Sequence, residues 1–351
     1  MIARSFSGIK VAGIACAVPS KIKYTDEYSD YYGKDSVQRF KQATGIESRY
    51  LSNGKQTASD LCYVAAKALM KKNNLTENDV DALIFVTQSA DYSIPATAFV
   101  LHKRLNLKAD CLVFDINLGC SGFVNGIYIL SGMIQSGMIE RALLLVGDAV
   151  IDRPLTDDKS FSMMFGDAGS ACILEKGNGE IKGMIRSDGE GYNTLITPFP
   201  GARFPINREN LERFENPQKM DGDDTFLFTI TKVPKLFKEF YNYFECSFED
   251  FDYCILHQAN LMIINQIIKK LKMPAEKVPV SIAKYGNTDG ASVPVGIVDL
   301  CESITEDKTL KLITSGFGIG LSWGIVSFEI NTEDVLPMIF TDDYFEEGYN
   351  V

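Results

Sequence analysis

Strand-like and helix-like segments alternate along the whole chain, and several of them recur in the same order in its second half. Segment 79–86 recurs as 250–257, segment 142–148 as 310–316, and segment 170–177 as 323–330. The helix after Cys120 has its counterpart in 290–304. Alternation of this kind is typical of α/β folds whose sheets are covered on both faces. A repeat that keeps its order indicates two similar halves fused in one chain.

The repeat divides the 351 residues into three parts. Residues 1–180 form a first half that carries Cys120, and residues 181–331 form a second half. The boundary is expected near 176–184, where KGNGEIKG interrupts the apolar pattern. Residues 332–351 form an acidic C-terminal extension. Two halves also suit the length, because a chain of this size exceeds one ordinary core.

Charge and composition exclude several classes of function. A net charge of −11 argues against nucleic-acid binding, which needs a basic face. No apolar run approaches the roughly 20 residues that span a bilayer, so we expect no membrane insertion. The eight cysteines lack paired spacings such as C-x-x-C, so neither a metal site nor a disulfide framework is indicated. Free thiols favour a cytoplasmic protein.

Cys120 is the first candidate for chemistry. It lies between an apolar segment, 111–118, that predicts a buried strand, and an apolar helix that begins near Ser121. Unpaired backbone N–H groups and the positive end of a helix dipole favour a thiolate there, and the thiolate is the nucleophilic form of cysteine. Cysteine is also a common small core residue, which is the simpler interpretation of the other seven. The position at a strand-to-helix turn sets Cys120 apart.

A histidine and an asparagine are the expected partners of Cys120. Of the two histidines, His102 lies in a helical context, whereas His257 directly follows the strand DYCIL, where α/β folds place catalytic groups. The amide of Asn287 can donate to a carbonyl oxygen as negative charge builds there. A turn or helix N-cap is the alternative role for this asparagine. The glycine-rich turn at 315–324 offers backbone N–H groups for an oxyanion hole with Cys120.

In their order and separations, the segments DINLGCSGF, HQAN, GNTDGASVP and FGIGLSWG resemble the β-ketoacyl-acyl-carrier-protein synthase III family. Further matches are Thr44-Gly45-Ile46, the segment 165–169 and Met220-Asp221-Gly222, and the likeness extends to about residue 330. The resemblance implies a thiolase-like α/β fold, in which two pseudo-symmetric halves form five layers, α-β-α-β-α. It also implies a homodimer.

The resemblance implies a decarboxylative Claisen condensation. Cys120 takes an acyl group from a thioester, and His257 and Asn287 hold a malonyl thioester carbonyl while carbon dioxide leaves. The enolate then attacks the acyl-Cys120 carbonyl. The implied substrates are acyl-CoA or acyl-ACP together with malonyl-ACP, the implied partner is acyl carrier protein, and no tightly bound cofactor is expected. The implied pathway is fatty-acid, lipid or specialised-metabolite biosynthesis.

Family positions also provide the remaining site residues. The implied oxyanion hole and acyl pocket comprise Phe317, Gly318, Ile319, Gly320 and Ile94. Ile94 occupies the place where the family often has a phenylalanine that closes the partner subunit's pocket. The implied carrier-binding residues are Arg39, Lys159, Gly222 and Asn260.

The chain departs from the family pattern at the carrier-binding positions. Arg39 or Phe40 would have to serve in place of the usual tryptophan, and Lys159 replaces an arginine. Met262 and Leu227 replace a further arginine and a lysine. Because these losses remove charges that grip phosphates, a dedicated carrier protein or an unusual acyl donor fits the sequence.

Two alternatives to condensation remain at the level of sequence. Cys120 could pass its acyl group to an oxygen or nitrogen nucleophile without decarboxylation. The chain could also be a non-catalytic partner subunit, although such subunits usually lose the cysteine or the histidine.

Overall fold

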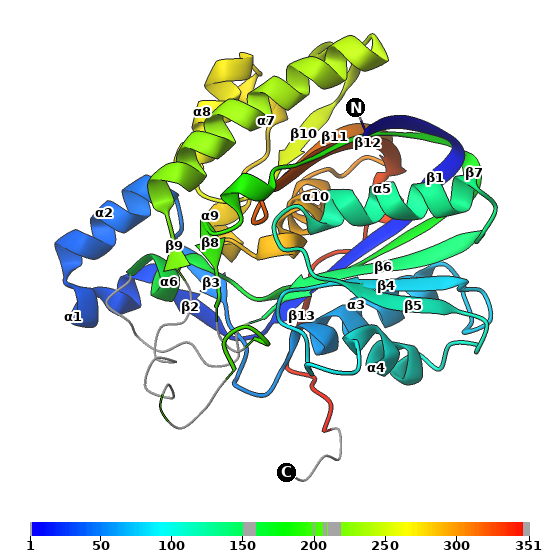
Figure 1. The fold of residues 1–351 in the computed structure, drawn as a ribbon, viewed down its shortest axis with the longest axis horizontal. Coiled ribbons are helices and arrows are strands. Elements are labelled where there is room, and N and C mark those ends of the chain that lie inside the picture. Colours follow the sequence, from blue (N-terminus) through cyan, green and yellow to red (C-terminus); the bar gives the residue numbers. More distant parts are fainter. Residues whose placement is uncertain (1, 150–158, 199–200, 206–208, 210–218, 347–351) are drawn as a thin grey trace.

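Helices and strands alternate as the sequence predicts in the computed structural model, which describes residues 2–149, 159–198, 201–205, 209 and 219–346 (Figure 1). The strands are β1 (Ile2–Pro19), β2 (Ile22–Tyr24), β3 (Ser48–Tyr50), β4 (Ala82–Val86), β5 (Leu112–Ile116), β6 (Arg141–Asp148), β7 (Ala168–Ser187), β8 (Leu195–Ile196), β9 (Lys219–Met220), β10 (Tyr253–Leu256), β11 (Thr309–Gly318), β12 (Ser322–Asn331) and β13 (Ile339–Thr341). The α-helices are α1 (Ser29–Tyr32), α2 (Lys34–Thr44), α3 (Ala58–Lys72), α4 (Thr97–Arg104), α5 (Gly122–Gln135), α6 (Lys159–Met164), α7 (Gly222–Phe244), α8 (Leu261–Leu271), α9 (Ile282–Tyr285) and α10 (Ser292–Glu302).

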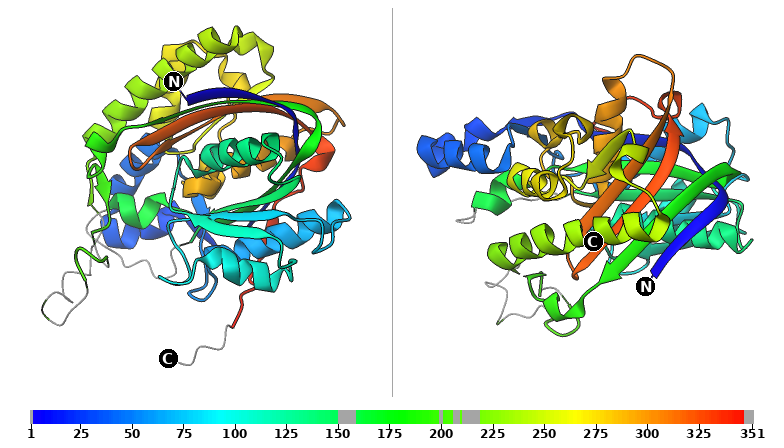
Figure 2. Two further views of the ribbon diagram at one scale, coloured as in Figure 1. Left: turned by 45° about the vertical axis from the view of Figure 1, so that its right-hand side comes forward. Right: turned by 90° about the horizontal axis from the view of Figure 1, so that it is seen from above.

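Nine of these strands form one hydrogen-bonded sheet within the described residues. Its main path runs β10-β11-β12-β7-β6-β4-β5, and β1 pairs with both β7 and β13. The two longest strands, β1 and β7, are antiparallel neighbours from Ile2 beside Ile185 to Ala17 beside Gly169. The sheet bends around α5 and α10, which lie between its two arms (Figure 2).

This bend produces the predicted five layers. Helices α3 and α4 cover one arm, α7 and α8 cover the other, and α5 and α10 fill the space between them (Figures 1 and 2). Each helical layer has its own apolar core: Phe123 of α5 lies in the central core, Leu61 of α3 in one outer core, and Phe237 of α7 in the other. All three side chains are fully buried, and burial of each stabilises the fold by roughly 1.5–3 kcal/mol.

The predicted internal repeat corresponds to a repeated topology. In the first half β4 is parallel to β6, which is antiparallel to β7. In the second half β10 is parallel to β11, which is antiparallel to β12. Strand β7 serves both halves, because its first part pairs with β6 and its last part with β12. The predicted boundary at 176–184 therefore falls inside one strand, at the Ser7–Ile9 register shift of β1, and the domain limits stay a prediction.

Strand β5 is less buried than its sequence predicts. The apolar segment 111–118 favours a buried strand, but β5 forms the end of the sheet. Leu112 is 43% exposed, and the rest of the strand is half-buried. The sequence prediction was wrong here because an apolar pattern does not reveal which strand lies at a sheet edge.

Part of the C-terminal extension folds back onto the first half. Strand β13 lies parallel to β1, with Phe340 beside Val18, and Gln56 Nε2 donates to the backbone oxygens of Thr341 and Asp343 at 3.0 and 2.8 Å. Within the described ranges, no helix is both long enough and apolar enough to cross a bilayer.

Candidate active site

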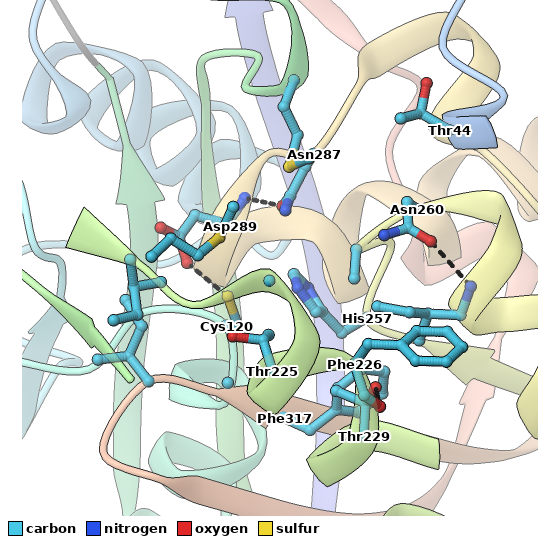
Figure 3. Close-up of a pocket in the computed structure, with 18 of the residues that line it drawn as sticks. Thr44, Cys120, Thr225, Phe226, Thr229, His257, Asn260, Asn287, Asp289 and Phe317 are labelled. Atoms are coloured by element: carbon cyan, nitrogen blue, oxygen red, sulfur yellow. Dashed lines mark hydrogen bonds between the residues drawn. The ribbon is translucent and has the colours of Figure 1, made fainter. Parts of the chain in front are cut away.

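One cavity of about 290 Å³ brings the three predicted catalytic residues together. Cys120, His257 and Asn287 all line it, although they come from three distant parts of the chain (Figure 3). Its walls are mostly apolar and are formed by the end of α2, the end of α6, and helices α7 and α8. The further lining residues are Ala43, Thr44, Met164, Phe165, Leu195, Met220, Gly222, Thr225, Phe226, Thr229, Ala259, Asn260, Met262, Ile263, Asp289, Phe317, Gly318, Ile319 and Leu321.

Cys120 occupies the tight turn between β5 and α5. The turn is closed by a hydrogen bond from the Gly122 N–H to the Gly119 oxygen at 2.6 Å. Gly318 at the end of β11 packs directly against the cysteine, since a methyl group on Gly318 would lie 2.7 Å from Cys120 Cβ and 2.9 Å from Sγ. Any side chain at position 318 would therefore overlap the cysteine, and only glycine leaves room for the sulfur.

The environment of Cys120 differs from the one predicted. The helix dipole was expected to favour thiolate, but Sγ donates a hydrogen bond to Asp289 Oδ1 at 3.1 Å. Burial, followed by the negative charge of Asp289 and this hydrogen bond, raises the pKa of the Cys120 thiol well above its ordinary value. The resting side chain is therefore a thiol, and the local dipole does not overcome the desolvation and the neighbouring carboxylate.

His257 follows β10 as predicted and is held rigidly. Its backbone N–H donates to the Ser315 oxygen at 2.8 Å, and Nδ1 lies 2.6 Å from the Ser292 hydroxyl. The ring of Phe317 lies edge-on to it at 5.3 Å between centroids. Burial lowers the pKa of His257 to about 3, and a hydrogen bond with the Asp289 backbone opposes that shift. The imidazole is neutral at physiological pH.

Asn287 is fixed by its backbone and by one side of its amide. Its N–H donates to the Met164 oxygen, and its own backbone oxygen accepts from Gly166, both at 3.0 Å. Oδ1 accepts from the Asp289 N–H at 2.9 Å. This contact is the turn-forming role considered as the alternative, and it also orients the amide. Nδ2 makes no hydrogen bond among the described residues, so it is available as a donor at the cavity.

The other predicted oxyanion and acyl-pocket residues divide into two groups. Phe317, Gly318 and Ile319 line the cavity, and Phe317 is almost fully buried. Gly320 belongs to the same turn but does not line it. Ile94 lies in the loop before α4, is 86% exposed, and is also not a lining residue of this chain's cavity.

The predicted carrier-binding residues divide in the same way. Gly222 and Asn260 line the cavity at the starts of α7 and α8, where Asn260 Oδ1 caps α8 by accepting from the Ile263 N–H at 2.8 Å. Arg39 is exposed on α2 and does not line the cavity. The backbone of Lys159 begins α6, but its side chain lies outside the described part of the structure.

Three polar residues near the site were missed at the level of sequence. Asp289 contacts the cysteine sulfur, Ser292 contacts His257, and the buried Asp148 ends β6 close enough for Asp289 to raise its pKa. Asp289 and Ser292 lie in the GNTDGAS segment, and their closeness in sequence to Asn287 is the one sequence feature that could have indicated a place in the site. No cluster of metal-ligating side chains occurs among the residues that the structure describes.

A thiol, a neutral imidazole and an amide at the end of one apolar cavity, on this fold, define a thiolase-like condensing enzyme, which is an acyltransferase. Two family models for 3-oxoacyl-[acyl-carrier-protein] synthase III match the chain, one over residues 114–189 and its C-terminal counterpart over 245–330. The chain belongs to this family. Proteins named 3-oxoacyl-[acyl-carrier-protein] synthase III, or variants of that name, match most of the length of this chain.

A Campylobacter jejuni protein provisionally named 3-oxoacyl-[acyl-carrier-protein] synthase 3 is 33% identical over 349 residues, which cover 94% of this chain and 97% of that one. A β-ketoacyl-[acyl-carrier-protein] synthase III of Clostridium perfringens is 31% identical and covers 90% of this chain and 97% of its own. The crystal structure of a 3-oxoacyl-(acyl-carrier protein) synthase from Burkholderia xenovorans is 36% identical, has a TM-score of 0.90, and covers 97% of this chain and 99% of its own. These likenesses favour condensation over the two alternatives.

Proposed function

We propose that this chain joins a Cys120-bound acyl group to the carbon of a malonyl thioester with loss of carbon dioxide. The observation that carries the proposal is the convergence of Cys120, His257 and Asn287 on one mostly apolar cavity. Each group has the character that its step requires. The cysteine offers a nucleophile, and the two neutral partners offer hydrogen-bond donors that add no charge.

In the first step, Sγ of Cys120 attacks the thioester carbonyl of the acyl donor, and the donor thiolate leaves. The oxyanion that forms is stabilised by the N–H groups of Cys120 and Gly318. The Cys120 N–H donates to no backbone oxygen among the described residues, which supports this role. A preorganised donor of this kind is worth roughly 2.7–4 kcal/mol in the transition state.

In the second step, His257 and Asn287 donate hydrogen bonds to the malonyl thioester oxygen as carbon dioxide leaves. Negative charge moves from the carboxylate to this oxygen, so donors placed here stabilise the transition state more than the bound substrate. A neutral histidine stabilises the enolate without protonating its carbon. Ser292 supports this role, because a hydroxyl that donates to Nδ1 leaves the ring proton on Nε2.

The mostly apolar cavity suits the uncharged arm that carries the thioester better than the phosphate groups of coenzyme A or acyl carrier protein. Met262 and Leu227 are 46% and 57% exposed, where the family pattern has basic residues. We propose that coenzyme A or acyl carrier protein delivers the acyl group and that acyl carrier protein delivers malonate. We also propose that few residues of this chain bind the phosphate groups of these carriers. Gly222 and Asn260 line the cavity at the starts of α7 and α8, where the arm of the thioester would lie.

We also propose a homodimer in the cytoplasm. The edge strand β5, with Leu112 43% exposed, and the 86% exposed Ile94 supply apolar surface that a second copy would cover. All eight cysteines are free of disulfides, as a reducing compartment requires. Sedimentation equilibrium measures the assembly, and a monomer at micromolar concentration would contradict the dimer.

Release of labelled carbon dioxide from malonyl thioesters tests the function. With an acyl donor present, the wild type should release carbon dioxide and form a 3-oxoacyl product, and mass spectrometry should detect one acyl group on the protein. Cys120→Ala should lose both the adduct and the product. Cys246→Ala is the matched control, because Cys246 is also partly exposed but lies away from the cavity. Acyl transfer to an alcohol or amine without carbon dioxide release would refute the proposal.

A further inference from the structure

Asp289 is a partly buried residue whose carboxylate directly contacts the reacting sulfur, and the condensation steps give it no task. It stands in the short turn Asp289–Ala291 before α10, and its Oδ1 accepts the only side-chain hydrogen bond that Cys120 donates within the described chain (Figure 3). No cation is paired with Asp289 among the described residues. Desolvation without a paired cation makes the charged form of this carboxyl costly and raises its pKa, so Asp289 can act as a proton acceptor.

Two titratable side chains, Cys120 and Asp148, interact with this carboxyl, and a third, His257, contacts the Asp289 backbone. Cys120 lies before α5, Asp148 lies at the end of β6, and His257 follows β10. Oδ1 of Asp148 accepts hydrogen bonds from the Thr87 and Ser89 hydroxyls and from the Gln88 N–H, whereas Oδ2 is buried with no partner among the described residues. A carboxylic acid proton on Oδ2 is consistent with that isolation. Since two neighbouring desolvated carboxyls cannot both ionise readily, and the pKa of Asp148 is raised well above its usual range by burial and by the charge of Asp289, Asp289 is the first of the two to ionise.

We propose that Asp289 takes the thiol proton of Cys120 when the enzyme is acylated, holds it throughout decarboxylation, and returns it to the sulfur when the product forms. The inference rests on the proposed function, because it assigns a proton carrier to the two half-reactions of condensation.

The bonds and charges balance in both half-reactions. In acylation, the S–H bond of Cys120 breaks, Oδ1 of Asp289 gains the proton, a C–S bond forms, and the donor leaves as a thiolate that is protonated by water outside the cavity. In condensation, the malonyl carboxylate leaves as carbon dioxide, the enolate carbon bonds to the acyl carbon, and the C–S bond to Cys120 breaks. The departing thiolate recovers the proton from Asp289, which is again a carboxylate.

The surroundings of Asp289 explain why its proton affinity changes between the two half-reactions. Burial raises the pKa of Asp289, and the hydrogen bond from Cys120 is the interaction that opposes this rise. Once the sulfur is acylated it has no proton to donate, so the opposing interaction disappears and the protonated acid is favoured. When the thiolate is released beside the acid, its charge draws the proton back.

Asp289→Asn is a suitable probe for this role. The Asp289 backbone has φ 49°, a left-handed conformation that asparagine adopts more readily than other non-glycine residues. The amide oxygen still accepts from the thiol, so the variant removes the basic site and keeps the contact. Asp299→Asn is the matched control, since Asp299 pairs with Lys284 at 2.6 Å on another part of the surface.

Infrared difference spectroscopy tests the proton's destination without any acyl donor. The probe is iodoacetamide, used at pH 7 on the Cys246→Ala protein so that Cys120 is the accessible thiol. Alkylation should create a carboxylic acid band, which should be absent in Asp289→Asn and present in Asp299→Asn. If alkylation of the parent protein produces no such band, Asp289 does not receive the proton and the inference is wrong.

Single-turnover acylation tests whether that transfer matters for the rate. At pH 7, acylation of Asp289→Asn should be about 10²–10⁴ times slower than that of the parent protein, and its rate should rise with pH where the parent rate is flat. Equal or faster acylation of the variant would overturn the inference, because Asp289 would then only raise the thiol pKa. A protein that gains the infrared band but accepts no acyl donor would refute the proposed function and leave the proton transfer standing.

Discussion

The neutrality of His257 leads to a measurable pH dependence of stability. Its pKa is lowered to about 3 by burial, and the ordinary value in an unfolded chain is about 6.5. At pH 5, roughly 1% of the folded protein but about 97% of the unfolded chain carries a proton on this ring. Because the unfolded state binds more protons, acid favours unfolding. The stability that His257 contributes is complete above pH 6.5 and is lost as the pH falls from 6.5 toward 3.

The magnitude follows from the separation of the two pKa values. Between pH 8 and pH 5, protonation of the unfolded chain costs the folded state about 2 kcal/mol, at 1.36 kcal/mol for each unit between 6.5 and 5. Urea unfolding of the wild type and of His257→Gln at both pH values isolates this amount, since all other titrating groups cancel in the comparison. The difference in stability between the two proteins should shrink by about 2 kcal/mol at pH 5.

Proton NMR provides the direct check. The chain contains only two histidines, so His257→Gln identifies which imidazole signal belongs to His257. That signal should not shift between pH 8 and pH 5. A titration midpoint near 6.5 would refute both the burial argument and the assignment of His257 as a neutral donor.

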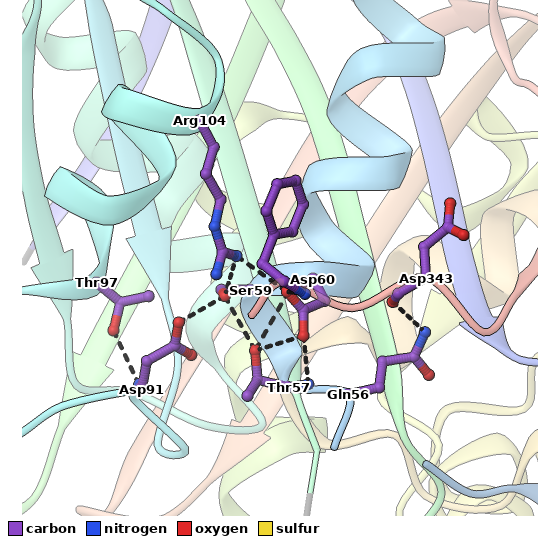
Figure 4. Close-up of polar contacts among 9 residues, drawn as sticks. Gln56, Thr57, Ser59, Asp60, Asp91, Thr97, Arg104 and Asp343 are labelled. Carbon is purple, nitrogen blue, oxygen red and sulfur yellow. Dashed lines mark hydrogen bonds and ion pairs between the residues drawn. The ribbon is translucent and has the colours of Figure 1, made fainter. Parts of the chain in front are cut away.

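Two further substitutions test the packing around the site and a buried ion pair in the first half of the chain. Gly318→Ala should slow acylation of Cys120 by at least about 100-fold, measured by the mass gain, because its methyl group would lie 2.9 Å from the sulfur and displace it. Arg104→Ala should cost about 3–5 kcal/mol in urea unfolding, because it leaves the Asp60 carboxylate, which Arg104 Nη1 contacts at 3.0 Å, buried without its cation (Figure 4). Lys176→Ala, which breaks an exposed pair, should cost less than 1 kcal/mol and serves as the control.

The sequence was sufficient for the architecture and for the three converging residues. The repeated order of apolar segments predicts the repeated strand topology, because hydrophobic periodicity can be recognised in a single sequence. His257 directly follows β10, Cys120 lies in the turn between β5 and α5, and Asn287 lies in the loop between α9 and α10. The edge where parallel strands end gathers such loops in space. Their convergence is therefore a consequence of topology that residue patterns can reveal.

The contact between Cys120 and Asp289 could not be predicted in the same way. It joins residues 169 positions apart, and it depends on the exact turn that places an aspartate in a left-handed conformation beside the sulfur. A helix dipole is a local feature that the sequence reveals, whereas desolvation and a neighbouring carboxylate are tertiary features. In this site the tertiary effects are larger, and the cysteine is consequently a thiol and not the thiolate that local reasoning predicts.

Burial is the common cause of the unusual protonation states in this cavity, and it serves both half-reactions. The same loss of water keeps His257 neutral, Cys120 protonated and Asp289 inclined to accept a proton. Without a proton on Asp289, the malonyl carboxylate would enter an acylated site that already holds a negative charge. With that proton in place, the substrate carries the one charge beside the sulfur, and decarboxylation moves this charge toward the two neutral donors on His257 and Asn287. A cationic histidine would stabilise the malonyl carboxylate as well as the enolate and would hold the substrate in its ground state.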